Sequence, residues 1–226
     1  MTLENEENKL KTLLLILNES DLLDEANIKN LFSCFPGVEK EGVENLIVYV
    51  DFLKTINAES KKALVHIFKE RIHGFALEFP SFSVDIIEDY ETPSTVTPST
   101  VIPSTVALPE AVQTKSPGMS VCFVFGLGGR DELKQILSDF ITRCRNEDFQ
   151  TQTSEMTSDY ISDSLKLPFE PDLIISHAKH TLTDFMIWQT VYSEYYFFEK
   201  DVGKVTDSDF RKAFDSFYKR DRRYGA

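Results

Sequence analysis

The chain has 226 residues, which is enough for one α/β domain with a substantial core, and 42% of them are hydrophobic, as in a globular protein. Its net charge of −13 argues against partners that need a basic surface, namely nucleic acid and the anionic face of a membrane. The three cysteines, Cys34, Cys122 and Cys144, form no CxxC pair and no metal-ligand spacing, so we expect buried thiols in a reducing compartment.

The N-terminal residues MTLENEENKLK are polar and acidic, unlike a signal peptide. The apolar run that follows them, TLLLIL, is far too short to span a bilayer. We therefore expect a cytoplasmic protein that reaches a membrane only indirectly, at its periphery, through a partner or a product.

The first part of the chain alternates short apolar runs with helical patterns. The apolar runs predict strands at 12–18, 45–52 and 82–88. Apolar residues at helical spacing predict helices at 24–35 and 57–72. The first of these helices is expected to end before the Pro36-Gly37 pair.

Residues 91–118 interrupt this alternation with three tandem copies of Pro-Ser-Thr-Val. A proline every five residues cannot sustain a helix, and the segment offers little that could pack a core. Neither flank alone shows a complete fold. We therefore expect one domain over 1–226 that contains 91–118 as a long, disordered loop.

The second part of the chain returns to alternating strands and helices, with strands predicted at 120–125 and 172–176. Between them, apolar residues at helical spacing predict a helix. These residues are Leu133, Ile136, Leu137, Phe140, Ile141 and Cys144. A last helix is expected to start near Thr206, with Asp209 completing a capping box. This alternation predicts the α/β class, with a mostly parallel central sheet flanked by helices.

Two short motifs allow a ligand site but favour a structural role. The glycines in FGLGGRDEL (125–133) could form a phosphate-binding turn, but Asp131 occupies the third position of the glycine pattern, so a tight turn with positive φ is favoured. His177 and His180 follow a strand and could hold a metal. They have no third ligand nearby, so exposed loop histidines are favoured.

Two other segments leave their alternatives open. The aromatic stretch DFMIWQTVYSEYYFF (184–198) fits either a packed core or a subunit interface, where Trp and Tyr are enriched. The cationic end KRDRRYGA (219–226) fits either a helix terminus that offsets the helix dipole or a phosphate contact through Arg223 and the Gly225 N–H.

The second half of the chain resembles the cis-prenyltransferases, the undecaprenyl and dehydrodolichyl diphosphate synthase family. The matching segments follow in order and spacing over roughly the last hundred residues: GGRDEL, PDLIIS, FMIWQTVYSEYYF and FRKAFDSFYKRDRRYG, ending in Arg-x-Gly. Members of the family show a Gly-Gly-Arg turn, a Pro-Asp-Leu strand, a Trp-Gln-x-x-Tyr-x-Glu block and a closing Arg-Arg-Phe-Gly.

The departures from the family pattern fall on its catalytic motifs. Self-sufficient members end their first strand in His-x-Met-Asp-Gly-Asn, whose aspartate holds magnesium, whereas this chain has LILNES (15–20) there. The family's arginine-rich Arg-Thr-Ser-Gly-Glu segment is replaced by SHAKHTLT (176–183), which contains no arginine. Losing these guanidinium groups is expected to weaken diphosphate binding.

The resemblance therefore implies a non-catalytic accessory subunit of the Nogo-B receptor type. Such a chain would pair with a catalytic cis-prenyltransferase subunit as a heterodimer or heterotetramer, and Mg²⁺ would lie in that partner's active site. Arg223 and Gly225 would contact isopentenyl diphosphate at the shared site. The implied interface residues are Phe185, Trp188, Gln189, Tyr192, Glu194 and Phe197.

Two alternatives remain. The chain could be a divergent homodimeric cis-prenyltransferase that works alone, in which Lys179, His177 and His180 would have to replace the missing arginines. It could also be a non-enzymatic adaptor that has kept only the fold, with its C-terminal residues acting as a helix cap.

Overall fold

The computed structural model describes residues 9–88, 118–146, 156–177 and 185–220. Six strands form one sheet in the order β3-β4-β2-β1-β5-β6, and every neighbouring pair is parallel. The strands are β1 (Thr12–Asn18), β2 (Asn45–Asp51), β3 (Ser83–Glu88), β4 (Ser120–Phe125), β5 (Leu173–Ser176) and β6 (Glu194–Phe197). The predicted α/β class is thereby confirmed, and the Pro-Ser-Thr-Val repeats lie outside the described residues, as does all of the predicted loop 91–118 except residue 118.

The helices follow the strands along the chain, as the alternating pattern predicts. They are α1 (Glu19–Leu23), α2 (Glu25–Lys40), α3 (Ala58–Glu78), α5 (Gly129–Asn146), α7 (Ser158–Ser164), the 3₁₀ helix η3 (Val202–Lys204) and α8 (Asp207–Tyr218). Thr206 caps α8, and Asp209 completes the predicted capping box.

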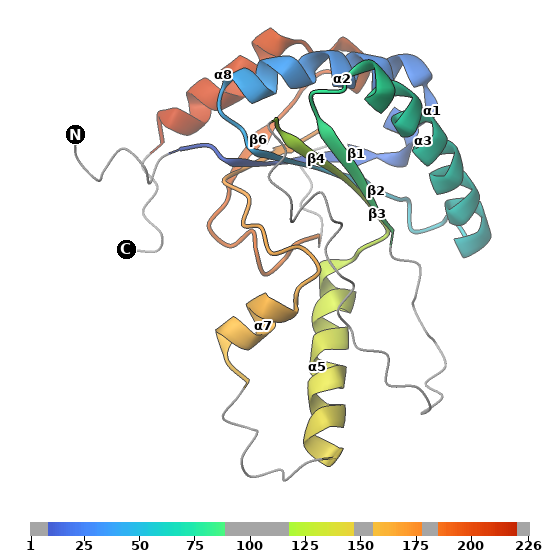
Figure 1. The fold of residues 1–226 in the computed structure, drawn as a ribbon, viewed down its shortest axis with the longest axis vertical. Helices are drawn as coiled ribbons and strands as arrows, with labels where there is room; N and C mark the ends of the chain where they lie inside the picture. Colours follow the sequence, from blue (N-terminus) through green and yellow to red (C-terminus); the bar gives the residue numbers. More distant parts are fainter. Residues whose placement is uncertain (1–8, 89–117, 147–155, 178–184, 221–226) are drawn as a thin grey trace.

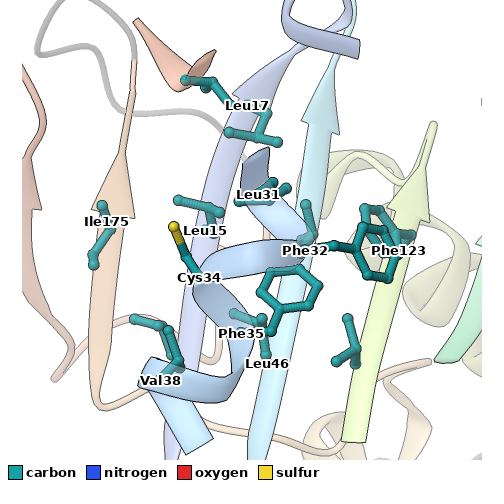
Figure 2. Close-up of a cluster of buried hydrophobic side chains, with 14 of the residues drawn as sticks. Leu15, Leu17, Leu31, Phe32, Cys34, Phe35, Val38, Leu46, Phe123 and Ile175 are labelled. Carbon is teal, nitrogen blue, oxygen red and sulfur yellow. The ribbon is translucent and has the colours of Figure 1, made fainter. Parts of the chain in front are cut away.

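One face of the sheet carries a large apolar core beneath α2, α3 and α8 (Figure 1). Phenylalanines dominate this layer, and Phe32 of α2 stacks on Phe123 of β4 with 5.9 Å between ring centroids. Figure 2 shows Phe32, Phe35 and Cys34 projecting from α2 onto the strands. The central strands are buried on both faces, which explains their continuous apolar runs.

The other face of the sheet is covered differently, because α5 and α7 project away from it (Figure 1). Its core is smaller and takes Leu167, Phe185 and Met186 from segments without regular secondary structure. Phe185 stacks on Tyr49 of β2 with 3.9 Å between ring centroids. The helix α5 packs on α7 through Phe140 and Tyr160, 5.3 Å apart, and leaves Leu137 and Ile141 exposed.

Three predictions about the elements are corrected by the structure. The helix predicted over 24–35 continues through Pro36 to Lys40, because Phe35 and Val38 are fully buried on either side of the proline and their packing outweighs the lost hydrogen bond. The helix over 57–72 extends to Glu78, since Phe75 still packs on the core. The aromatic stretch contains an unpredicted strand, β6, at the edge of the sheet.

Candidate functional site

Parallel α/β sheets bind ligands outside the carboxyl ends of their strands, where the strand order reverses. In this sheet the order reverses at β1, which has β2 on one side and β5 on the other. The residues at that position are Asn18, which ends β1, Asp21 in α1, Ser176, which ends β5, and His177, which follows it. These four residues therefore define the candidate site, which we call the carboxyl-edge site.

The carboxylate of Asp21 is engaged by two other residues of the carboxyl-edge site. The N–H of Asn18 donates to Oδ2 of Asp21 at 2.8 Å, which closes the capping box of α1. Nδ1 of His177 lies 3.4 Å from the same Asp21 oxygen, and its Nε2 faces the carbonyl oxygen of Lys200. The carboxylate that a cation would need is therefore already shared within the protein.

The space beneath this site is almost filled. A hollow of about 10 Å³ remains there, lined by Leu15, Leu17, Leu31, His177, Phe198, Val202, Val205 and Phe210. Such a volume is at the lower limit for one water molecule. Pockets that bind small ligands have about 300–1,000 Å³, so this part of the described chain offers no room for an apolar substrate.

His177 corrects one prediction from the sequence, because only 9% of its side chain is exposed. The prediction of a solvent-exposed loop histidine is wrong because Asp21 and Lys200, both remote along the chain, enclose the ring. His180 and Lys179 lie outside the described residues. Among the residues that the structure describes, no group of three His, Cys, Asp or Glu side chains could hold a metal ion.

The glycine-rich turn after β4 has the tight geometry that we predicted. Gly126 has φ of 83°, and α5 starts at Gly129. The first turn of α5 already holds a carboxylate, since Oε1 of buried Glu132 accepts the N–H of Lys166 at 2.8 Å. A phosphate at this helix end would meet that negative charge.

The helix α8 runs from the carboxyl edge of the sheet to its amino edge. Near its start, Nζ of Lys200 contacts both carboxylate oxygens of Asp209, at 2.7 and 2.8 Å. Just past its end, Nη1 of Arg220 contacts Oε2 of Glu194 at 2.6 Å, and Glu194 is the first residue of β6. Arg223 and Gly225 lie outside the described residues, but the chain leaves the described part at the amino edge beside β6.

Two contacts hold the start of α8 close to α2. The side-chain amide of Asn30 donates to the carbonyl oxygens of Val202 and Val205, both at 2.9 Å. A Cβ at Gly37 would lie 2.9 Å from Cγ of Asp207, so a larger residue there would require the Asp207 side chain to shift. The C-terminal helix is therefore seated firmly on the domain from which the tail emerges.

Comparison with known proteins identifies the family. The model for "Putative undecaprenyl diphosphate synthase" matches residues 34–225. The chain belongs to the cis-prenyltransferase family. The match takes in the Gly-Gly-Arg turn, the strand β5 and the C-terminal Arg-x-Gly on which the resemblance rests.

Curated relatives in the cis-prenyltransferase family match part of the chain. An "Isoprenyl transferase" of Thermotoga maritima is 36% identical over 110 residues, 47% of this chain and 46% of the relative. A "Ditrans,polycis-undecaprenyl-diphosphate synthase ((2E,6E)-farnesyl-diphosphate specific)" of Buchnera aphidicola is 28% identical over 123 residues, 53% and 50% of the two chains. The chain thus spans about half the length of the curated relatives it matches.

Solved structures extend the likeness of fold to nearly the whole chain. A probable undecaprenyl diphosphate synthase from Campylobacter jejuni has a TM-score of 0.63 at 19% identity, covering 96% of this chain and 99% of that one. Lavandulyl diphosphate synthase from Lavandula x intermedia, in complex with dimethylallyl diphosphate, has a TM-score of 0.65 at 16% identity, covering 97% and 100%. Both confirm a cis-prenyltransferase-like fold.

The aromatic stretch of this chain is divided between core and surface. Phe185 is 2% exposed, and Gln189 is buried with its Nε2 donating to the carbonyl oxygen of Leu167 at 3.1 Å. Trp188 is half-buried and donates to Oγ of Ser162 in α7 at 3.1 Å. Core packing thus accounts for part of the aromatic density.

The other residues of the stretch lie nearer the surface. Tyr192 is 55% exposed, while Glu194 and Phe197 are half-buried on the edge strand β6. The ring of Phe197 stacks on Tyr195 at 6.3 Å. Any subunit interface at this stretch therefore involves Trp188, Tyr192 and β6, with Phe185 and Gln189 supporting them from inside the chain.

The three cysteines are buried and unpaired by disulfides, as the sequence predicted. Burial raises the pKa of Cys34 to about 11 and that of Cys122 to about 12. Both thiols stay protonated at neutral pH, which leaves them without the thiolate needed for nucleophilic chemistry.

Proposed function

We propose that this cis-prenyltransferase chain is the non-catalytic subunit of a heteromeric enzyme. The complex would add isopentenyl units to an allylic diphosphate and form a long polyprenyl diphosphate. The chain would bind a catalytic subunit of the same family, as a heterodimer or heterotetramer, and extend its Arg-x-Gly tail into that partner's active site.

The observation that carries this proposal is the closed carboxyl-edge site. A catalytic member must hold a magnesium diphosphate and accommodate a growing hydrocarbon, whereas here Asp21 is committed to Asn18 and His177, and the hollow beneath measures about 10 Å³. The apolar layer above the sheet is filled by side chains of the protein itself, such as Phe32, Phe68 and Phe123. Among the described residues, the hollow beneath the site is far too small for a polyprenyl chain.

The course of α8 supports a role in another subunit. Arg223 is the third residue past Arg220, so its Cα lies within roughly 10 Å of the end of the described chain. The carboxyl-edge site of the same chain lies at the opposite edge of the sheet. The seven-residue strand β1 separates the two edges by roughly 20 Å. A neighbour docked against β6 is therefore the natural recipient of the tail.

An apolar surface on the same side of the sheet as α5 fits this partner. Leu137 and Ile141 of α5 are 46% and 50% exposed, and Val191 and Tyr192 of the aromatic stretch are 67% and 55% exposed. Trp188 and α7 connect the two groups through the hydrogen bond to Ser162. We propose that this partner surface, made by α5 and residues 187–192, contacts the catalytic subunit.

In this proposal the catalytic partner holds the magnesium, and the complex reaches the membrane only through its product. Mg²⁺ would be held in the catalytic subunit and would supply charge stabilisation there, and Arg223 and the Gly225 N–H of this chain would add electrostatic stabilisation to isopentenyl diphosphate. No helix among the described residues is both long enough and apolar enough to cross a bilayer. The polyprenyl product would bring the complex to the membrane periphery of the cytoplasm.

A second candidate is a self-sufficient cis-prenyltransferase, and the names of the relatives favour it. The curated proteins that the chain matches are named as isoprenyl transferases and an undecaprenyl diphosphate synthase. In that case residues 178–184, which lie outside the described residues, would have to supply the diphosphate contacts together with His177. The full-length relatives also carry about half of their sequence outside the match.

One assay separates the two candidates. The purified chain is incubated with Mg²⁺, farnesyl diphosphate and labelled isopentenyl diphosphate, alone and after co-expression with the host's other cis-prenyltransferase-like chain. We expect long product only from the co-expressed pair. Long product from the isolated chain would establish the self-sufficient enzyme instead.

A further inference from the structure

His177 lies where three parts of the fold meet at the carboxyl edge of the sheet. Its backbone N–H donates to the carbonyl oxygen of Ile16 at 3.1 Å, which fixes it beside β1. Its ring lies between Asp21 of α1 and Lys200, which precedes η3 and α8. The ring therefore bridges the first helix of the chain and the start of its C-terminal helix.

Both ring nitrogens of His177 face acceptors. Nδ1 lies 3.4 Å from the Asp21 carboxylate, and Nε2 contacts the carbonyl oxygen of Lys200. A neutral imidazole has one N–H, so one of its nitrogens would present a lone pair to one of these oxygens. Only the imidazolium ion donates on both sides, and the geometry therefore fits the protonated ring.

The charges around His177 act in the same direction. Asp21 faces the ring from α1, and Asp201 faces it from the segment before η3. The two nearby ammonium groups are held elsewhere, that of Lys200 by Asp209 and that of Lys204 by Asp201. Burial lowers the pKa of His177, but Asp21, the Lys200 carbonyl and Asp201 outweigh it, so the pKa is raised above 6.5.

We propose that protonated His177 is a pH-dependent clamp that fastens the start of the C-terminal helix to the carboxyl edge of the sheet. The clamp is closed when the imidazolium bridges Asp21 and the Lys200 carbonyl. When the ring loses its proton, one of the two contacts becomes a repulsion between lone pairs, and the segment 199–206 loosens. This device goes beyond the proposed function and operates in the isolated chain.

The pH range of the clamp follows from the direction of the shift. A histidine whose pKa is higher in the folded than in the unfolded chain stabilises the fold fully below the unfolded value, near 6.5. That contribution disappears as the pH rises through the folded value. The clamp is thus closed in solution below about pH 6.5 and opens as the pH rises through the folded-state pKa of His177.

The most direct test is an NMR titration of the histidine rings in the full chain. The signal of His66, whose side chain is 76% exposed, is followed alongside that of His177 in every variant. We expect His177 to titrate above 6.5 in the wild type and to shift downward in Asp21→Asn, which keeps an oxygen for the Asn18 N–H. A His177 ring that titrates at or below 6.5, or that is unaffected by Asp21→Asn, would overturn the clamp.

A stability measurement tests the consequence for the fold. We compare the Tm of the wild type with that of His177→Gln, which stays neutral, and use His66→Gln as the matched control. The excess Tm of the wild type over His177→Gln should fall by about 2–4 °C between pH 6 and pH 8.5. Amides of 202–206, corrected for intrinsic exchange rates, should exchange about fivefold faster at the higher pH. A constant Tm excess, or unchanged exchange, contradicts the proposal.

Discussion

The two faces of the sheet are built for different purposes. Beneath α2, α3 and α8 the core is solid, and side chains such as Phe32, Phe35 and Phe123 are fully buried. On the other face α5 and α7 project away from the sheet, and Leu137 and Val191 remain exposed (Figure 1). The comparison teaches that one face of a fold shared with diphosphate synthases can be densely packed while apolar side chains stay exposed on the other.

The largest expected effect tests the solidity of the closed face. Replacing Phe123 with alanine should lower the free energy of unfolding by about 3–5 kcal/mol, because the ring is fully buried against Phe32. Leu137→Ala on the partner surface is the matched control, and it should cost less than about 0.5 kcal/mol in the isolated chain. Chemical denaturation measures both values. Similar losses in the two variants would remove the distinction between the faces.

A second prediction concerns the anchor of α8 on the closed face. Lys200 and the cap of Thr206 hold the pKa of Asp209 well below its usual value of 3.8, so its contribution to stability is complete above that pH and is lost as the pH falls. Asp209→Asn should cost about 2 kcal/mol at pH 7. The difference from the wild type should shrink in acid, as followed by denaturation at several pH values.

The control for this prediction is Asp215→Asn, an exposed position on the same helix. It should change the free energy of unfolding by less than about 0.5 kcal/mol at either pH. An equal loss in the two variants would mean that the helix responds to net charge and not to the Asp209 contacts.

The third and smallest effect concerns the partner surface. Leu137→Asp should leave the Tm of the isolated chain within a few degrees of the wild type, because the side chain is half exposed. It should weaken binding to the catalytic subunit by about tenfold, since a charge would be buried in an apolar contact. Calorimetric titration of the two purified subunits measures the affinity. Unchanged affinity would place the interface elsewhere.

Much of this architecture was predictable from the sequence, and the reasons are physical. The strands β1, β2 and β4 lie inside the sheet, where burial on both faces demands continuous apolar runs. The edge strand β6 was missed because its four residues are all half-buried and mix Glu194 with aromatic side chains. The continuation of α2 through Pro36 was missed because tertiary packing of Phe35 overrides a local signal.

The candidate site was less predictable than the fold. The family motifs pointed to the segment after β1 and to residues 176–183, but the enclosure of His177 depends on Asp21 and Lys200, which lie far from it in the sequence. The spacing of Asn18 and Asp21 does match a capping box, so that part of the site had a signal. The direction in which α8 crosses the sheet is set by tertiary packing, so no local sequence pattern predicts it.

The measurement that tests the central claim most directly is the activity of the assembled complex with Arg223→Ala in this chain. A guanidinium lost from a reacting diphosphate should lower turnover at least about tenfold while the two subunits still co-purify. Lys219→Ala, four residues earlier in the chain, is the matched control and should retain activity. Unchanged turnover in a well-assembled Arg223→Ala complex would contradict the account and leave the tail with the role of a helix terminus.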